Sequence, residues 1–275
     1  MKWRYVDTGT STGAWNMAAD EAIMRHCAAG LVPPTLRFYR WSPATLTLGY
    51  FQRAERDVDF DACRRQGIDV VRRLTGGRAV LHDHELTYSI IMAKANCPLP
   101  ESVTESYRIL SRGLAEGFRI LNLPVAMTRP APRAGKLGSS GACFDALSAW
   151  ELAADGKKIV GSAQARRYDA LVQHGSILND LEADKLFSTM KDADPLRLAR
   201  AKETFLDKAT SIRHLLGHPL EMADLISAFK EGFFLALGRD LNAEFEESPL
   251  TPGELEMTER LAAEKYQSDE WNMIR

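Results

Sequence analysis

Apolar positions recur along the chain with two different spacings, which predict strands and helices in mixed order. Alternating or continuously apolar segments rich in β-branched and aromatic residues predict strands at 2–6, 35–41, 45–49, 68–73, 86–93 and 170–177. Apolar residues three and four positions apart predict helices from Thr12 to about Cys27 and at 59–66, 105–121, 181–190, 195–208, 221–237 and 252–267.

Turn residues divide these elements into one continuous unit. Pro33-Pro34 ends the first helix, and Asp155-Gly156 predicts a hairpin between the segments 149–154 and 158–165. The segment 124–141 is irregular, rich in small residues and typical of a mobile loop or part of a site. We therefore expect an α/β (α+β) domain over 1–248, including a short strand at 244–245. A helical tail over 249–275 is expected to pack on it.

Composition narrows the class of protein. The 275 residues are 45% hydrophobic and 26% charged, as in ordinary globular proteins, which excludes disorder and collagen-like repeats. With 35 Lys+Arg against 37 Asp+Glu, the charge balance argues against a nucleic-acid binder. The longest strongly apolar run, 233–237, is far below the ~20 residues that span a bilayer, so we expect no membrane segment. The first ten residues hold no apolar core, so we expect no secretory signal and a cytoplasmic location.

The four cysteines are well separated, at Cys27, Cys63, Cys97 and Cys143. The lack of a CxxC pair argues against a zinc ribbon and a thioredoxin-type site, and we expect no metal. In a reducing compartment each thiol is either a small buried hydrophobe or a reactive nucleophile. Cys143 is the best candidate nucleophile, because the small residues 138–142 before it leave its sulfur accessible.

The segment 72–83 is a second candidate for chemistry. It carries two arginines on a predicted strand, then the pair Gly76-Gly77, and then His82. Paired glycines let a backbone approach a ligand closely, and arginines bind phosphate or carboxylate. A tight turn with solvated arginines explains the segment equally well. It is not a P-loop, because no GxxxxGK[ST] occurs in the chain.

Two further segments follow the hairpin turn. Lys157 and Lys158 point in opposite directions on a strand, but periodicity does not decide which one faces the sheet. A lysine in a cleft polarises a carbonyl or stabilises a thiolate, although solvated lysines are the more common outcome at a hairpin. His174 precedes Gly175-Ser176 near a strand end, where a histidine is more often structural.

Five segments together resemble the biotin/lipoate protein ligase superfamily over essentially the whole chain: RRLTGGRAVLHD (72–83), GACF (141–144), DGKKIVGSAQARR (155–167), QHGSI (173–177) and KYQSDEW (265–271). Within that superfamily they are most similar to the cysteine-dependent octanoyltransferases. The resemblance implies a mixed β-sheet flanked by helices, which agrees with the predicted order of elements.

The resemblance also implies an activity. Octanoyl passes from octanoyl-acyl carrier protein to Cys143 as a thioester, and then to a lysine of a lipoyl domain, typically glycine cleavage protein H. Lys158 matches the active-site lysine of the family. No cofactor, ATP or metal is implied, and we expect a monomer. The segments implied to form the acyl-binding walls supply Arg73, Thr75, Gly76, Gly77, Arg78, Ala79, His82, Gly161, Ser162, Ala163, His174, Gly175 and Ser176.

Basic residues are expected around the mouth of this site, where they would attract acidic carrier and lipoyl domains. They are Arg72, Arg73, Arg129, Arg133, Lys136, Arg166 and Arg167.

Three other functions stay open. An ATP-dependent lipoate–protein ligase shares the RRxTGG and GKK segments but needs no cysteine. An amidotransferase that moves lipoyl or octanoyl groups between lipoyl domains would use the same cysteine and lysine. A non-catalytic lipoyl-domain binding protein would need neither residue.

Overall fold

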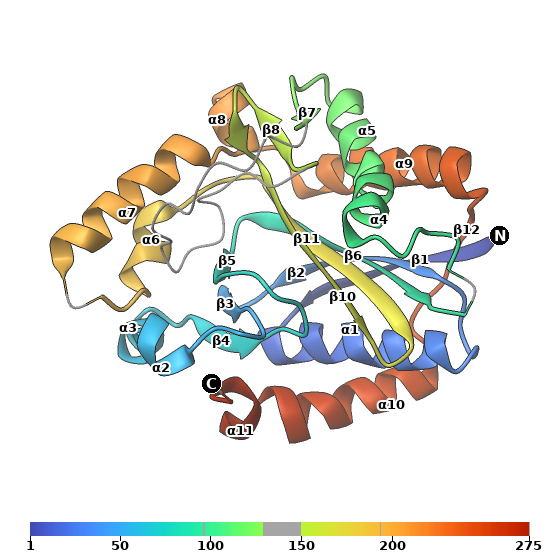
Figure 1. Ribbon diagram of the computed structural model, residues 1–275, viewed down its shortest axis with the longest axis horizontal. Helices are drawn as coiled ribbons and strands as arrows, with labels where there is room; N and C mark the ends of the chain where they lie inside the picture. Colours follow the sequence, from blue (N-terminus) through green and yellow to red (C-terminus); the bar gives the residue numbers. More distant parts are fainter. Residues whose placement is uncertain (96, 129–149, 193, 275) are drawn as a thin grey trace.

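The structure is a computed structural model that describes residues 1–95, 97–128, 150–192 and 194–274. Its strands and helices follow one another in mixed order along the chain (Figure 1). The strands are β1 (Lys2–Ser11), β2 (Thr35–Trp41), β3 (Thr45–Leu48), β4 (Asp69–Arg72), β5 (Val80–His82), β6 (Glu85–Ala93), β7 (Ala126–Met127), β8 (Leu152–Ala154), β9 (Lys157–Lys158), β10 (Val160–Arg167), β11 (Ala170–Leu178) and β12 (Glu244–Glu247).

The helices fall into three groups along the chain. The first group is α1 (Gly13–Ala28), α2 (Ala54–Asp57), α3 (Phe60–Arg65), α4 (Val103–Leu110) and α5 (Arg112–Ile120). The second is α6 (Ala183–Ser188), α7 (Pro195–Lys208), α8 (Ile212–Leu216) and α9 (Met222–Leu241). The last is α10 (Pro252–Leu261), the π-helix η1 (Ala262–Tyr266) and α11 (Asp269–Asn272). No helix of the described residues has the length and apolar character needed to cross a bilayer.

A mixed sheet forms the centre of the fold, in the order β10-β11-β6-β2-β1-β12. β1 is parallel to β2 and β12, whereas β2, β6, β11 and β10 pair antiparallel in succession. Two small sheets, β4-β3-β5 and β7-β8-β9, lie beside it. The predicted mixed sheet with flanking helices is therefore confirmed.

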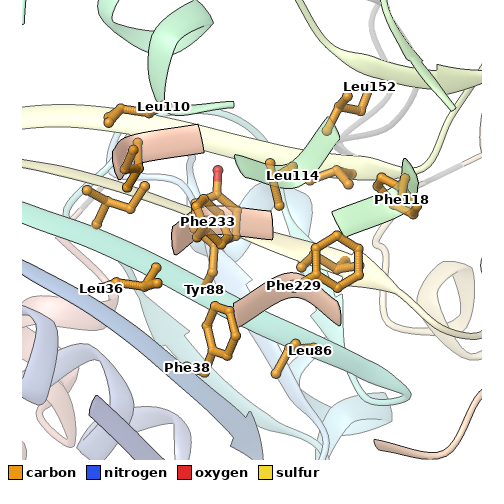
Figure 2. Packing of buried hydrophobic residues seen from close by; sticks show 14 of the residues in the cluster. Leu36, Phe38, Leu86, Tyr88, Leu110, Leu114, Phe118, Leu152, Phe229 and Phe233 are labelled. Atoms are coloured by element: carbon orange, nitrogen blue, oxygen red, sulfur yellow. The ribbon is translucent and has the colours of Figure 1, made fainter. Parts of the chain in front are cut away.

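The helices cover both faces of the central sheet (Figure 1), with α1 and α10 packed together on one face and α4, α5 and α9 on the other. Figure 2 shows the core on the second face, where Phe229 and Phe233 of α9 lie near Tyr88 and Phe38 of the sheet. α5 fits closely against α9 because it presents glycines. A Cβ built on Gly117 would lie 2.3 Å from Cδ1 of Phe229.

The C-terminal segment is tied to the first strand and first helix. Thr251 and Glu254 form a capping box at the start of α10. The buried Glu254 also accepts a hydrogen bond of 2.9 Å from Nη1 of Arg4 on β1. The division of the chain at residue 248 stays a prediction.

Most predicted elements form. The differences occur where a segment with one continuous hydrophobic pattern is divided into two elements by its tertiary packing. The predicted helix 105–121 is divided at Ser111 into α4 and α5, because α5 takes the direction that places its glycines against α9. The predicted strand 158–165 is divided at Ile159. Lys158 pairs with Ala153 in a small sheet, and Val160 pairs with Ile177 in the central sheet.

The hairpin turn at Asp155-Gly156 is confirmed, with φ of +49° and +74°. The predicted C-terminal helix continues beyond Leu261 with π-helical geometry. The sequence patterns did not predict the short elements α2, α8, α11, β5 and β7, which carry too few residues to show a period.

Candidate active site

A pocket opens between the central sheet and the β4-β3-β5 sheet, with an empty volume of about 440 Å³. We call it the acyl pocket, after the acyl-binding role that the resemblance implied for the segments lining it. Its walls are Met17, Tyr39, Trp41, Thr47, Arg73, Gly77, Val80, His82, Thr87, Gly161, Ser162, Ala163, His174, Gly175 and Ser176. Ten of these come from three segments singled out in the sequence, so the fold brings 72–83, 155–167 and 173–177 together.

Glycine is required at two positions of this wall. A Cβ on Gly175 would lie 2.4 Å from Oγ of Ser162 and 2.8 Å from Cε1 of Tyr88, so a side chain there would displace the neighbouring strands. Gly77 has φ of +96°, which favours glycine, and a Cβ there would meet Nη2 of Arg73 at 2.7 Å.

His82 is held between the two sheets. Its Nδ1 lies 2.7 Å from Oε1 of Glu85 and its Nε2 lies 2.9 Å from Oγ1 of Thr47. The ring stacks on Trp41 with 4.2 Å between the centroids. Glu85 also accepts hydrogen bonds from Thr87 and Ser176, so its buried carboxylate is well supplied with donors.

His174 belongs to a second buried group. Its Nε2 lies 2.7 Å from Oγ1 of Thr75 and its Nδ1 lies 3.1 Å from Oδ2 of Asp20. Burial lowers the pKa of His174, although the hydrogen bond to Asp20 acts in the opposite direction. Burial acts to raise the pKa of Asp20, but the His174 hydrogen bond and the charge of Arg37 outweigh it and lower this pKa. Arg37 Nη1 lies 2.7 Å from Oδ1 of Asp20.

These pairings determine what the pocket offers to a ligand. The ring nitrogens of His82 and His174 and the carboxylate of Glu85 are all engaged by protein partners. Arg73, Ser162 and Ser176 of the wall also hydrogen-bond to protein groups. The rest of the wall is largely ring faces, methyl groups and glycine backbone. An apolar chain can therefore enter without leaving a buried polar group unpaired.

The structure corrects the expectation for Arg72 and Arg73. Arg72 is fully buried and donates to the carbonyl oxygens of Gly49, Gln52 and Asn272 at 2.8–2.9 Å. Arg73 is also buried and donates to the carbonyls of Gly76 and Arg78, each at 2.8 Å. Neither guanidinium lies at the mouth or is solvated, because the turns around it present carbonyls that need donors.

The other predicted residues of the diglycine turn and of the rim lie in different surroundings. Gly76 faces Phe51, whose ring is 66% exposed, and Arg78 follows in the same turn. Ala79 is buried in a second apolar cluster and faces away from the acyl pocket. Among the predicted rim residues, Arg166 is exposed, and the Arg167 guanidinium lies 3.8 Å from the ring centroid of Tyr50.

Lys158 is the lysine that faces inward. It is buried on β9, and its Nζ lies 2.5 Å from Oε1 of Glu151, which is also buried. Lys157 instead reaches the surface, where its Nζ donates to the carbonyl of Leu206 at 3.0 Å. The tertiary structure therefore settles a choice that strand periodicity left open.

Cys143 lies outside the described residues, as do Arg129, Arg133 and Lys136. Two of the described cysteines are poor nucleophiles. Burial raises the pKa of Cys27 to about 12 and that of Cys63 to about 11, so both are held as thiols. The Cys97 thiol lies 3.2 Å from Sδ of Met92 in an apolar cluster. Cys143 stays the predicted nucleophile.

The sequence patterns did not identify the buried charged residues that hold the two histidines of the pocket in place. Asp20, Arg37 and Glu85 are buried and fix both histidines directly or through a partner. A charged side chain inside an apolar run, such as Asp20 in the segment AADEAIM, could have indicated a buried charged residue.

Comparison with known proteins gives one family. Residues 12–234 match the lipoyl protein ligase A/B catalytic domain family. The chain is 46% identical to octanoyltransferase LipM of Kyrpidia tusciae over 273 residues, which is 98% of each chain. It is 42% identical to octanoyltransferase LipM of Bacillus subtilis over 277 residues, covering 99% of this chain and 98% of the other.

The fold is similar to solved lipoate–protein ligases. Lipoate-protein ligase A bound with ATP superposes with a TM-score of 0.78 at 28% identity, covering 99% of both chains. A bi-partite lipoate protein ligase from Thermoplasma acidophilum gives a TM-score of 0.79 at 27% identity, covering 99% of this chain and 96% of that one.

Proposed function

The chain belongs to the lipoyl protein ligase A/B catalytic domain family, and on that premise we propose that it transfers octanoyl from octanoyl-acyl carrier protein to a lysine of a lipoyl domain, typically glycine cleavage protein H. Octanoyl transfer is the activity named for its full-length relatives. The donor, the acceptor and the cysteine thioester are the parts that this proposal adds.

The acyl pocket is the observation that carries the proposal. Its polar side chains are paired within the protein, and its free surface consists of the Trp41–His82 stack, methyl groups and glycine backbone. Burial of an alkyl chain is worth roughly 0.8 kcal/mol per methylene, so a chain of octanoyl length gains several kcal/mol here. A free polar ligand would find few unpaired partners in these walls.

We assign the chemistry to Cys143 and Lys158. The Cys143 thiolate attacks the donor thioester carbonyl, and the carrier thiolate leaves with the electron pair of the broken C–S bond. The acceptor amine then attacks the new thioester, the Cys143 thiolate leaves, and the amine proton passes to solvent or to the thiolate. Because a thioester is converted to an amide, the exchange runs downhill without ATP.

The positive charge of Lys158 can act at two points of this reaction. An ammonium about 4 Å from a thiolate contributes on the order of 4 kcal/mol at an effective dielectric of about 20. The same charge stabilises the oxyanion that forms when the thioester is attacked. Glu151 fixes the ammonium in place, because Nζ and Oε1 are only 2.5 Å apart in a buried setting.

The first prediction tests the proposal directly. Incubation of the protein with octanoyl-acyl carrier protein in nucleotide-free buffer should add one octanoyl mass at Cys143, and added lipoyl domain should then remove it. Intact-mass spectrometry and peptide mapping measure both steps. Cys143→Ser should abolish labelling, whereas the matched control Cys97→Ser should retain it.

Two results would contradict this assignment. Labelling at another cysteine would remove Cys143 from its role. A strict requirement for ATP and free octanoate would favour the ligase alternative, which the similarity to an ATP-bound lipoate-protein ligase keeps as the second candidate.

A further inference from the structure

The segment 265–272 at the end of the chain carries one of the five motifs singled out in the sequence, and the mechanism above gives it no role. We call it the C-terminal segment. It includes α11, which lies against β4 (Figure 1). Because β4 leads into the diglycine turn Gly76-Gly77, the C-terminal segment lies beside the strand that precedes a wall of the acyl pocket.

The C-terminal segment completes the outer edge of β4. In the described part of the chain, β4 is the first strand in the order β4-β3-β5, so this edge has no strand beside it. The backbone N–H of Arg72 instead donates to Oδ1 of Asn272 at 2.8 Å, and Nε1 of Trp271 donates to the carbonyl of Arg72 at 2.9 Å. Two side chains thus supply the hydrogen bonds that a neighbouring strand would supply.

The guanidinium of Arg72 extends this contact to the turn 49–52. Its Nη2 donates to the carbonyl of Asn272 at 2.8 Å. Its Nη1 donates to the carbonyls of Gly49 and Gln52 at 2.9 and 2.8 Å. Because a guanidinium is planar and its donors have fixed directions, this buried side chain joins the C-terminal segment to the turn 49–52 in one arrangement.

The turn 49–52 packs in its turn against the diglycine turn. The backbone N–H of Tyr50 donates to the carbonyl of Thr75 at 2.8 Å. A Cβ built on Gly49 would lie 1.9 Å from the carbonyl oxygen of Gly77, so the two backbones are in direct contact. Since Gly77 lines the acyl pocket, a displacement of the turn 49–52 would reach the pocket wall.

A wall of glycine backbone needs support from its neighbours. Gly76 and Gly77 have no side chain, and glycine has more conformational freedom than any other residue. Arg73 binds this turn from the strand that leads into it, through the carbonyl of Gly76. The turn 49–52 supports it from a second side, and that turn is itself held by Arg72 and the C-terminal segment.

The beginning of the C-terminal segment is anchored on α1. Nζ of Lys265 and the hydroxyl of Tyr266 each donate to Oε2 of Glu21 at 2.6 Å, and Glu21 is fully buried on α1. Nδ2 of Asn272 donates to the carbonyl of Tyr266 at 2.8 Å, so the Asn272 amide joins the two ends of the segment. Because α1 also supplies Met17 to the acyl pocket, the C-terminal segment connects two elements of the pocket wall.

We propose that Asn272 and Trp271 are positioning residues for the acyl pocket. Acting through Arg72 and the turn 49–52, they hold the diglycine turn where it contacts the acyl chain. This inference rests on the proposed function, which places the octanoyl group in the acyl pocket. It assigns the C-terminal segment to binding of the acyl group and gives it no part in the chemistry at Cys143.

Single-turnover acylation with octanoyl-N-acetylcysteamine tests this inference, because a donor without a carrier protein reports the binding of the acyl group. Asn272→Ala removes both hydrogen bonds of the side-chain amide. We expect the half-saturating donor concentration to rise about fivefold or more. The maximal rate, and the rate of iodoacetamide alkylation at Cys143, should stay within about twofold of the unaltered protein.

A second variant isolates one hydrogen bond. Trp271→Phe keeps an aromatic ring and removes the N–H that binds the carbonyl of Arg72. It should raise the half-saturating donor concentration about twofold or more, again with little change in the maximal rate. Should Asn272→Ala fail to fold, Trp271→Phe decides the test.

Two control variants separate positioning from general stability. Glu270→Ala changes an exposed side chain of α11. Gly117→Ala overpacks the contact of α5 with α9 on the other face of the central sheet and lowers the free energy of unfolding. Both controls should keep the half-saturating donor concentration of the unaltered protein.

Failure of this inference and failure of the proposed function give different results. An unchanged half-saturating concentration in Asn272→Ala and Trp271→Phe, or an equal rise in Gly117→Ala, would overturn the positioning role alone. A lower maximal rate at an unchanged half-saturating concentration would also overturn it, because the segment would then act on the chemistry. An absence of acylation of the unaltered protein by this donor and by octanoyl-acyl carrier protein would overturn the proposed function, and this inference with it.

Discussion

Two neighbouring lysines on one short strand have opposite environments. Lys158 is buried against Glu151, and Lys157 reaches the surface to a backbone carbonyl. Burying two charges costs desolvation free energy even when they are paired, and the Glu151–Lys158 pair is a place where the chain bears that cost. The contrast between the two neighbours follows from the alternation of side chains along a strand.

The residue-scale prediction concerns this pair. Lys158→Ala should raise the pKa of the Cys143 thiol by about one unit or more, because the thiolate loses a cation that stabilises it. The pH dependence of iodoacetamide alkylation, followed at Cys143 by peptide mapping, measures the shift. Lys157→Ala is the matched control and should leave the profile unchanged. An unchanged profile in Lys158→Ala would remove its role as charge partner.

At the scale of elements, glycines determine how closely helices and strands approach. α5 contacts α9 through Gly113 and Gly117, and a Cβ at either position would lie within about 2.3 Å of a phenylalanine ring. Gly238 on α9 is different, because the nearest contact of its built Cβ is an ordinary 3.5 Å. The two kinds of helical glycine make a matched pair.

Gly117→Ala should destabilise the protein by about 1–3 kcal/mol, because the added methyl overpacks the core at Phe229. Gly238→Ala should instead stabilise it by up to about 1 kcal/mol, because alanine loses less backbone entropy in a helix. Urea denaturation followed by circular dichroism measures both changes. Equal effects in the two variants would show that packing against α9 does not constrain α5.

At the scale of the whole molecule, a buried hydrogen-bond group joins three parts of the fold. Asp20 of α1 contacts Arg37 of β2 and His174 of β11, and His174 also contacts Thr75. These elements are far apart in the sequence and meet around the acyl pocket. The protonation state of His174 is therefore coupled to global stability.

This coupling predicts a pH dependence. Because burial lowers the pKa of His174, the unfolded chain binds its proton more readily below an ordinary pKa of 6.5. The free energy of unfolding should thus fall as the pH drops below about 6.5, by at most about 1.4 kcal/mol per pH unit from this group, and level off below the folded pKa. Urea denaturation between pH 8 and 5 measures the slope.

His174→Gln should reduce that slope, since glutamine does not titrate. His214→Gln is the matched control at an exposed histidine and should retain the slope of the unaltered protein. The same slope in all three proteins would contradict the role assigned to His174.

The order of elements followed from local patterns in the sequence, since alternation and helical spacing report which face of each element is buried. Lys158 was singled out by the resemblance, and the two glycine-containing segments by their small residues together with the resemblance. The division of 158–165 between two sheets could not be predicted, because Ile159 fits a strand pattern on both sides. The sequence also did not predict the roles of Asp20, Arg37 and Glu85, because their partners come from elements far away in the chain.

The sequence by itself determined the mixed sheet with flanking helices, the hairpin at 155–156 and the identity of the segments that meet at the acyl pocket. The tertiary structure alone decided which lysine is buried, that Arg72 and Arg73 bind backbone carbonyls, and which side chains line the acyl pocket. The physical reason is that periodicity is set by neighbours along the chain. Burial of a charge and the shape of a pocket depend on side chains that come together only when the sheets and helices pack.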